Sequence, residues 1–212
     1  WYAEGRTCDT PDPNNPKRGT PKGHELGTYS GKIEFESQSL KAFDANDPER
    51  PPVPHYIPSW EGHRSKEAAK FPLQLLTPHS RFSFHTHYDK HASWLDEIPG
   101  HRIQKEGYAW WPIRINPGDA AARGIHHHSI VKVFNDRGTV LCIAVVSERA
   151  RPGVVQSYSC SAKYDLLEPG NPDSPDRGGC VAVLTPGRMV SRNAAGMAVL
   201  SCLVDVARWE HN

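Results

Sequence analysis

A polar loop with the chemistry of an anion-binding site follows an apolar, strand-like run at Phe71–Leu76. Its candidate binding residues carry hydroxyl, imidazole and guanidinium groups: Thr77, His79, Ser80, Arg81, His85 and Thr86. Because such side chains would lack partners inside an apolar core, the loop must lie at the surface or line a site. Hydroxyl and guanidinium donors suit phosphate groups. Composition alone is equally consistent with an ordinary polar surface.

Two downstream segments offer groups that could complete such a site. They are Gln156–Tyr158 and Ser191–Asn193. Their amides and hydroxyls can bind a pyrophosphate and the edge of a purine ring. Both segments therefore supply candidate ligand contacts.

Histidines raise the alternative of a metal site. His85 and His87 would point to the same side of an extended segment, and His126–His128 adds three more imidazoles. A metal would need further ligands with fixed partners of their own, and no acidic residue or cysteine completes a known motif. We therefore predict no metal ligand here: the loop histidines bind an anion by hydrogen bonds, and His126–His128 forms a solvated turn.

Other catalytic motifs are missing from the sequence. It has no Gly-x-Ser-x-Gly elbow, no Gly-x-Gly-x-x-Gly or Walker-type loop, and no cysteine beside a histidine, so we assign no catalytic residue. The cysteines form no Cys-x-x-Cys pair and are predicted to be reduced and structural, with Cys142 and Cys202 buried in apolar strands.

The balance of charge argues against nucleic acid as a partner. Lys and Arg number 25 against 24 Asp and Glu, which leaves a net charge of +1. No apolar run approaches the ~20 residues that span a bilayer, so no membrane insertion is expected. With no signal peptide, a cytoplasmic location is expected, with the periplasm as the alternative. The start at Trp1 suggests a piece of a longer protein.

Residues 1–66 are predicted to form an extended lead-in that belongs with a preceding domain. Alternation at Gly31–Ser37 predicts one half-buried strand. The prolines of Asp47–Pro58 exclude helix and central strand, so this segment should lie as a ribbon on another surface.

Residues 67–212 are predicted to form one mostly β domain, a closed β-barrel with short helices. Asn135–Gly138 is typical of a hairpin turn, and Asn116 or Gly118 could cap a short helix ending at Gly124. An irregular or helical insertion is expected at Trp94–Glu106. The expected strands are Phe71–Leu76, Ala109–Ile115, Ile130–Phe134, Val140–Val146, Val154–Tyr158, Val181–Leu184 and Met197–Val206.

The order of these motifs resembles the final domain of the dimethyl-sulfoxide-reductase family of molybdenum and tungsten enzymes. The resemblance extends from Thr28 to Trp209. Within the family, the histidine-rich loop and Ser191–Met197 are most similar to the pyrogallol–phloroglucinol transhydroxylase branch. Each motif alone is unspecific, but several motifs in the same order are strong evidence for the family. The motifs that carry the resemblance are Gly31–Phe35, Pro54–Pro58, Thr77–Thr86, Ile115–Ala120, Arg151–Val155 and Gly178–Thr185.

The resemblance implies a six-stranded double-psi β-barrel that helps to hold a bis(molybdopterin guanine dinucleotide) cofactor with molybdenum or tungsten. Gln156 and Tyr158 would lie near a pterin edge and Asn193 near the far end of the cofactor. Upstream domains of the same polypeptide would supply the metal ligand, the acid–base residues and most of the cofactor contacts, and an iron–sulfur subunit is the expected partner. The residues that would line the pterin and pyrophosphate are Thr77, His79, Ser80, Arg81, His85 and Thr86.

The chain departs from the family pattern where Ala182 replaces a frequent asparagine and Cys180 replaces a usually polar residue. One cofactor hydrogen bond is therefore missing or comes from elsewhere. The leading hypothesis is a cofactor domain, inactive alone, of an enzyme acting on a small phenolic substrate. The alternatives are a free-standing barrel that binds an anionic small molecule and a small metal-dependent barrel enzyme using His85 and His87.

Overall fold

The computed structural model describes residues 33–87, 89, 93–159, 161–191, 194–197 and 202–210. The chain divides into two compact units, with the boundary between Ile57 and Pro58. The proposed division of the chain at residues 66 and 67 stays a prediction. Within the described ranges, no helix has both the length and the apolar character needed to cross a bilayer.

The described part of the first unit contains one helix, α1 (Gln38–Asp44), where a strand was predicted just upstream. Ile33 and Phe35 are 73% and 83% exposed, so their alternation finds no apolar surface to pair with. Ser37 caps the helix by accepting a hydrogen bond from the Leu40 amide at 3.3 Å. The predicted strand is therefore wrong over residues 33–37. Residues 47–58 form neither helix nor strand, as predicted.

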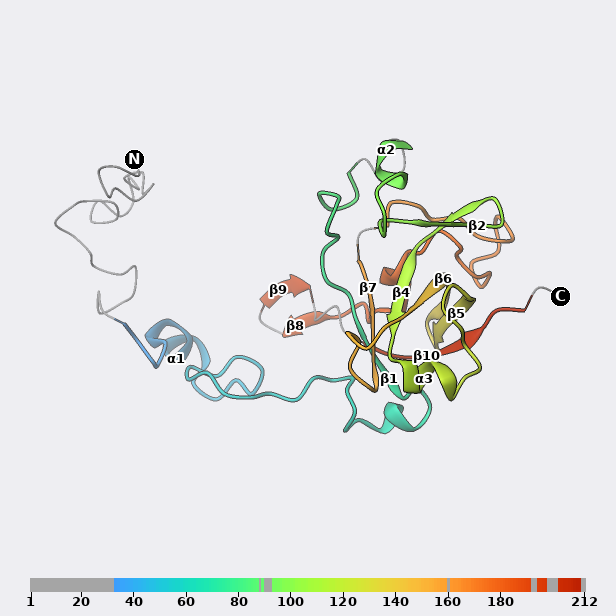
Figure 1. The fold of residues 1–212 in the computed structure, drawn as a ribbon. Coiled ribbons are helices and arrows are strands. Elements are labelled where there is room, and N and C mark those ends of the chain that lie inside the picture. The colour runs from blue at the N-terminus through green and yellow to red at the C-terminus, as the bar shows by residue number, and fades with distance from the viewer. Residues whose placement is uncertain are drawn as a thin grey trace, which may run out of the picture. The chain divides into compact units, whose positions relative to one another are not determined.

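Six strands of the second unit close into a barrel in the order β1-β10-β5-β6-β4-β7 (Figure 1). The described pairings are antiparallel except β1 with β7 and β4 with β6, which are parallel. The predicted mostly β fold and closed barrel are confirmed. The strands are β1 (Leu73–Leu76), β4 (Pro112–Ile115), β5 (Ile130–Asn135), β6 (Gly138–Val146), β7 (Val154–Ser157) and β10 (Cys202–Arg208).

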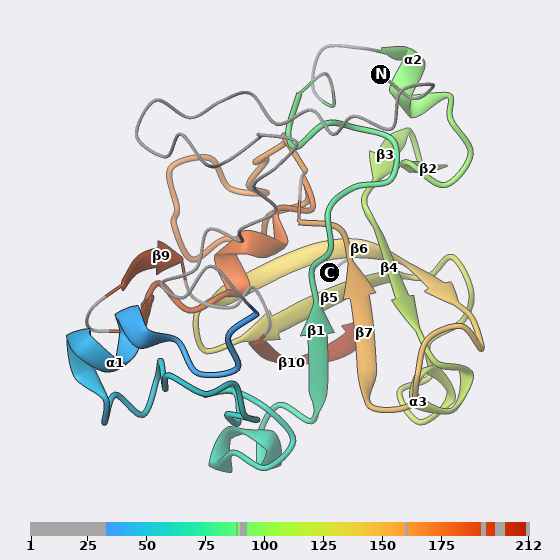
Figure 2. The same ribbon diagram turned by 90° about the vertical axis from the view of Figure 1, so that its left-hand side faces the viewer.

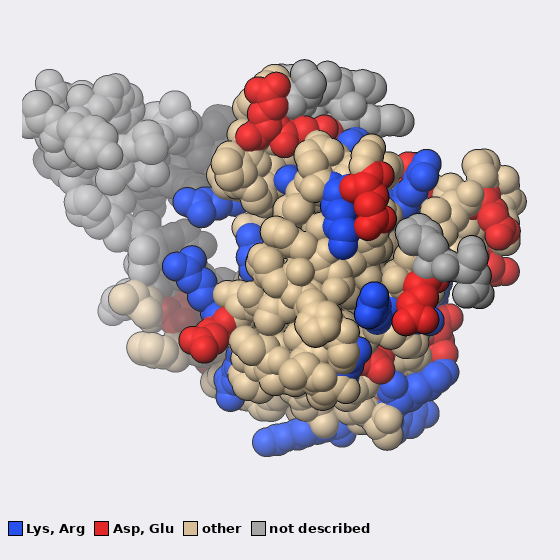
Figure 3. All heavy atoms as spheres, turned by 45° about the vertical axis from the view of Figure 1, so that its right-hand side comes forward, with Lys and Arg blue, Asp and Glu red and all other residues tan. Residues whose placement is uncertain are grey.

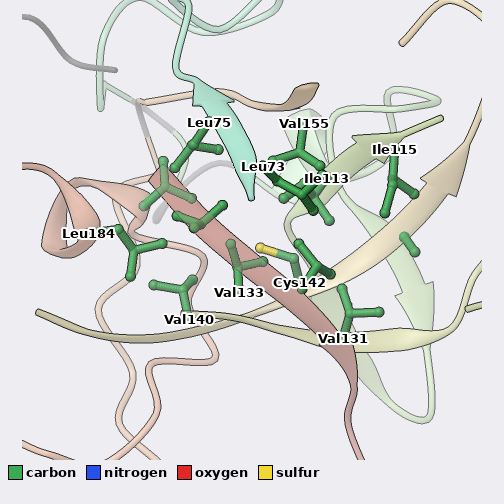
Figure 4. Close-up of a cluster of buried hydrophobic side chains, with 14 of the residues drawn as sticks. Leu73, Leu75, Ile113, Ile115, Val131, Val133, Val140, Cys142, Val155 and Leu184 are labelled. Atoms are coloured by element: carbon green, nitrogen blue, oxygen red, sulfur yellow. The ribbon is translucent and has the colours of Figure 1, made fainter. Parts of the chain in front are cut away.

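The barrel interior is filled by the alternate, inward-facing residues of these strands. Figure 4 shows aliphatic side chains from several strands pointing toward one another around the Cys142 sulfur. Each fully buried aliphatic side chain contributes about 1.5–3 kcal/mol by leaving water. Cys142 and Cys202 are both fully buried, as predicted. Burial raises the pKa of the Cys142 thiol and raises that of Cys202 to about 11, so both remain unreactive thiols.

The hairpin between β5 and β6 is confirmed at the predicted turn. The Asn135 side chain accepts from the Arg137 amide at 2.9 Å and donates to the Leu184 carbonyl at 2.8 Å. Leu184 belongs to η2 (Val181–Leu184), a 3-10 helix whose Val181 and Leu184 are buried in the barrel core. The predicted strand at these residues is wrong, because this apolar run packs against the core without pairing in the sheet.

Two further segments differ from expectation. The predicted strand at Ala109–Ile115 is split at Trp111 into β3 (Tyr108–Trp110) and β4. β3 pairs with β2 (Ile103–Lys105), which lies in the segment expected to be irregular or helical; α2 (Ser93–Asp96) precedes it. The last predicted strand, Met197–Val206, is confirmed from Cys202 onward in β10, and residues 198–201 lie outside the described residues. Its first residue, Met197, instead ends β9 (Ala194–Met197), which pairs with β8 (Met189–Ser191).

Two short helices complete the described unit. α3 (Pro117–Ala121) begins where predicted, since the Asn116 side chain accepts from the Gly118 amide at 2.9 Å. It ends slightly before the predicted Gly124. η1 (Lys66–Ala69) leads into β1.

We expect Gly179→Ala to be strongly destabilising. Gly179 has a φ of +87°, and an added Cβ would overlap the Cβ of the fully buried Trp111. Strain and overpacking together should lower the free energy of unfolding in urea by about 3 kcal/mol or more. Gly170→Ala is the matched control: its φ is +90°, but nothing lies within 4 Å of the added atom. It should cost about 1–2 kcal/mol; equal losses in the two variants would contradict the packing argument.

Candidate functional site

The barrel brings the polar loop and the Gln156–Tyr158 segment together. β1 and β7 are parallel neighbours, and Leu76 lies opposite Gln156 (Figure 2). Parallel strands end at the same edge, so the segments that follow them start side by side. The Ser159 amide donates to the Pro78 carbonyl at 3.0 Å and joins the two segments beyond the strands. The predicted neighbourhood is thus confirmed for this pair. Asn193 lies outside the described residues.

Most of the candidate side chains face outward. His79, Arg81, His85 and Thr86 are exposed, and Ser80 is half-buried. Gln156 and Tyr158 are also half-buried, whereas Thr77, directly after β1, is buried at 8% exposure. The loop therefore presents a charged donor, imidazoles and hydroxyls to solvent, from a strand end that is fixed in the barrel.

A turn within the loop changes the predicted relation of the histidines. His85 has a φ of +52°, and the His87 amide donates to the Phe84 carbonyl at 3.0 Å. Residues 85–87 therefore form a turn and not an extended segment, so the same-face argument for His85 and His87 does not apply. The His79 and His85 rings instead lie edge to face, with their centroids 5.0 Å apart.

A buried ion-pair network, not anticipated from the sequence, holds the distal end of the loop. Asp89 Oδ1 accepts from His101 Nε2 at 2.9 Å and from Arg102 Nε at 3.0 Å. Asp89 Oδ2 accepts from Arg102 at 2.8 Å and from the Ala162 amide at 2.8 Å. Burial opposes ionisation of Asp89, but the hydrogen bonds from His101 and Arg102 outweigh it and hold the pKa of this carboxyl well below its ordinary value.

Arg102 extends this network across several segments. Its guanidinium donates to the Ala109 carbonyl, to the Ser161 hydroxyl and to the Gly178 carbonyl. It also lies over the Trp111 ring, 4.6 Å from the centroid. The residue thereby connects the loop after β1 with the strand preceding β4 and with the segments around residues 161 and 178. No local pattern marks Arg102 in the sequence, because all of these partners are chosen by the tertiary fold.

Asp89, Asp96 and His101 also have the spacing of a cation site, with ligand atoms within 4.8 Å of one another. However, the two oxygens of Asp89 already accept four hydrogen bonds. Arg102 lies 3.8 Å from Asp96 as well, so a guanidinium already supplies the positive charge. The donor set therefore fits an ion-pair network better than a metal centre.

Segments outside this edge take ordinary structural roles. His126–His128 is an exposed turn, as predicted. The His127 Nδ1 atom accepts from the Val146 amide at 3.2 Å, which fixes the orientation of this ring. At the two positions that depart from the family pattern, Ala182 is exposed, and the Cys180 amide donates to Asp176 at 2.7 Å.

A known domain family matches most of the barrel. Residues 73–203 match the family described as "Molydopterin dinucleotide binding domain". This range contains the polar loop, β7 and the buried Asp89–Arg102 pair.

Characterised relatives match nearly the whole chain. It is 43% identical to the pyrogallol hydroxytransferase large subunit of Pelobacter acidigallici over 99% of the chain and 24% of that protein. It is 33% identical to a dimethyl sulfoxide/trimethylamine N-oxide reductase of Cereibacter sphaeroides over 91% of the chain and 22% of that protein. It is 37% identical to dimethyl sulfoxide reductase DmsA of Escherichia coli K12 over 81% of the chain and 20% of that protein. The chain thus spans about a quarter of the length of the curated relatives it matches.

The fold also occurs in a solved structure. Acetylene hydratase from Pelobacter acetylenicus superposes with a TM-score of 0.65 at 16% identity. The match covers 89% of this chain and 25% of that one. At this identity the likeness concerns the fold alone.

We expect Asp89→Asn to destabilise the protein by about 3–5 kcal/mol at pH 7, because Arg102 would remain buried without its hydrogen-bonded counter-charge and with only Asp96 at 3.8 Å. The folded pKa of Asp89 is depressed from its ordinary value of 3.8. The stabilisation that ionised Asp89 contributes to the fold is therefore fully present above pH 3.8 and is lost as the pH falls below this value. The stability of Asp89→Asn should vary less with pH in this acid range than that of the wild type.

Urea unfolding between pH 3 and pH 7 measures both effects. Asp165→Asn is the matched control, because Asp165 pairs with Arg177 at 2.8 Å but its side chain is 36% exposed. Its loss should stay below about 1 kcal/mol. A loss as small in Asp89→Asn would contradict the role of the buried pair.

Proposed function

Because the chain belongs to the family of molydopterin dinucleotide binding domains, we propose that it holds pterin and pyrophosphate–guanine parts of a bis(molybdopterin guanine dinucleotide) cofactor. The observation that carries this proposal is the family match over residues 73–203, which includes the polar loop. The adjacency of that loop and the end of β7 supports it, since one ligand could contact both.

The chemistry of this edge fits such a cofactor. Arg81 is exposed, so its guanidinium can form charge-assisted hydrogen bonds with a pyrophosphate. The Gln156 amide can both donate to and accept from the edge of a pterin, and Tyr158 offers a hydroxyl and a ring face. We assign the pterin and pyrophosphate contacts to Thr77, His79, Ser80, Arg81, His85 and Thr86, the pterin edge to Gln156 and Tyr158, and the far end to Asn193.

We further propose that this domain belongs to a longer molybdenum or tungsten enzyme. When bound, the cofactor supplies the redox chemistry, and the domain contributes orientation and electrostatics. The metal-ligating and acid–base residues belong to upstream domains, and an iron–sulfur subunit is the partner. A small phenolic substrate is proposed because the relative with 43% identity is named a pyrogallol hydroxytransferase. A cytoplasmic location stays a prediction.

Replacing the charged residue of the loop tests the cofactor assignment. Arg81→Ala in the full-length enzyme removes a charge-assisted hydrogen bond and should weaken cofactor binding by about 1.5–3 kcal/mol. Metal and guanine content per protein provide the measurement. Arg149→Ala, which removes an exposed guanidinium from the turn after β6, should leave both contents unchanged. Full cofactor content in Arg81→Ala would refute the assignment.

The isolated chain should bind guanine nucleotides weakly at best, because the other domains contribute most of the contacts. It should also contain no stoichiometric metal. Elemental analysis and equilibrium dialysis with GMP measure these two properties. One tightly bound zinc or iron per chain, lost on replacing His85 and His87, would instead favour a metal-centred barrel.

A further inference from the structure

Arg114 on β4 has a buried guanidinium nitrogen for which the described residues provide no hydrogen-bond acceptor. Its NH1 atom is inaccessible to solvent and has no partner among the described residues. A guanidinium remains charged in any protein environment. Buried donors of this kind are rarely left unpaired, and a charged one is costlier than a neutral one. Because NH1 is covered in this conformation, the half-buried Arg114 side chain must turn outward for an acceptor from outside the described residues to bind it.

Other partly or fully buried arginines of the barrel unit satisfy their guanidinium groups within the chain. Arg102 pairs with Asp89, Arg123 with Asp205 and Arg177 with Asp165. Within the described ranges, the Arg114 side chain makes no ion pair and no hydrogen bond. This contrast distinguishes Arg114 from the other partly buried arginines that the structure describes.

The position of Arg114 places it at the candidate cofactor edge. Ile113 and Ile115 are fully buried in the barrel, so Arg114 between them faces outward. It lies opposite Gln156 on β7, which in turn lies opposite Leu76 at the end of β1. Figure 2 shows these three strands side by side. Arg114 is therefore two strands away from the start of the polar loop.

Tyr158 determines how the guanidinium is held. The central carbon of the Arg114 guanidinium lies 5.1 Å from the centroid of the Tyr158 ring. An aromatic ring can position a cation while leaving the N–H groups free to bind an oxyanion. Neither the polar loop nor the hydroxyl-rich segments suggested this residue, because a lone arginine in a strand has no sequence signature.

We propose that Arg114 is an additional oxyanion-binding residue of this edge and that it binds a phosphate group of the dinucleotide. This inference rests on the proposed function. Planar guanidinium groups bind phosphate and carboxylate oxygens with the same two-pronged geometry. A carboxylate from the remainder of the longer polypeptide is therefore the other source of the same chemistry.

The charge distribution favours such a local site over general electrostatic attraction. On the face drawn in Figure 3, Lys and Arg side chains lie interspersed with Asp and Glu among the described residues. The net charge of the chain is only +1. Specific donors such as Arg114 and Arg81, and not a broad positive field, would then determine how a dinucleotide binds.

The test uses the full-length enzyme with Arg114→Met, Arg114→Lys and a control, Arg123→Met. Each protein is prepared with cofactor and, from a host unable to make the cofactor, without it. Two quantities are measured: the rate at which guanine dinucleotide is lost in mild urea, and the Tm of the loaded and cofactor-free forms. Arg123 suits as a control because its guanidinium is partly buried but already pairs with Asp205.

If Arg114 binds the phosphate, Arg114→Met should lose the dinucleotide about tenfold to a hundredfold faster than the wild type. The gap between the loaded and the cofactor-free Tm should shrink, with an intermediate effect in Arg114→Lys. Arg123→Met should change the two Tm values equally and leave the loss rate unaltered.

A carboxylate partner would produce a different result: in Arg114→Met, both Tm values would fall by the same amount while the loss rate stayed at the wild-type value. If the loss rate does not rise and neither Tm falls in Arg114→Met, the oxyanion role is overturned. The guanine content of the wild type distinguishes failure of the Arg114 assignment from failure of the proposed function. A wild type without guanine would refute the dinucleotide, and the cofactor-free Tm would then decide between a carboxylate partner and no role.

Discussion

The parallel pairing of β1 with β7 is the contact on which the candidate site depends. It closes the barrel, and its register sets Leu76 beside Gln156. Because the two strands run in the same direction, the loop after β1 and the segment after β7 begin at one edge. A sheet that remained open between these strands would separate the two groups of candidate residues, whatever their side chains.

The polar loop is attached at both ends, and this explains how a segment with so many exposed side chains can keep a defined position. Its start is fixed by β1 and by the bond from Ser159 to Pro78. Its far end is fixed by Asp89, whose carboxylate is bound to Arg102 in a fully buried pair. A buried pair adds little stability over apolar packing, but its geometry allows few alternatives. The exposed side chains between the two attachments are then available to a ligand.

Local features were predicted well where one short-range preference decided the structure. The Asn135–Gly138 hairpin and the Asn116 helix cap both depend on side-chain bonds to nearby backbone groups. The same reasoning failed at Val181–Leu184, where an apolar run suits a strand and a packed 3-10 helix equally well. It also failed at Ile33 and Phe35, because alternation predicts a strand only where an apolar surface covers one face.

By itself, the sequence determined the mostly β class, the apolar strands that fill the barrel and the supply of phosphate-competent groups in the loop. These properties follow from residue type and short spacing. Only the tertiary structure decided that Arg102 pairs with Asp89 and that Arg114 has no acceptor for one nitrogen in the described part of the chain. Both arginines carry the same charge and lie in β-rich sequence, but their partners depend on which distant segments the closed barrel brings within hydrogen-bond reach.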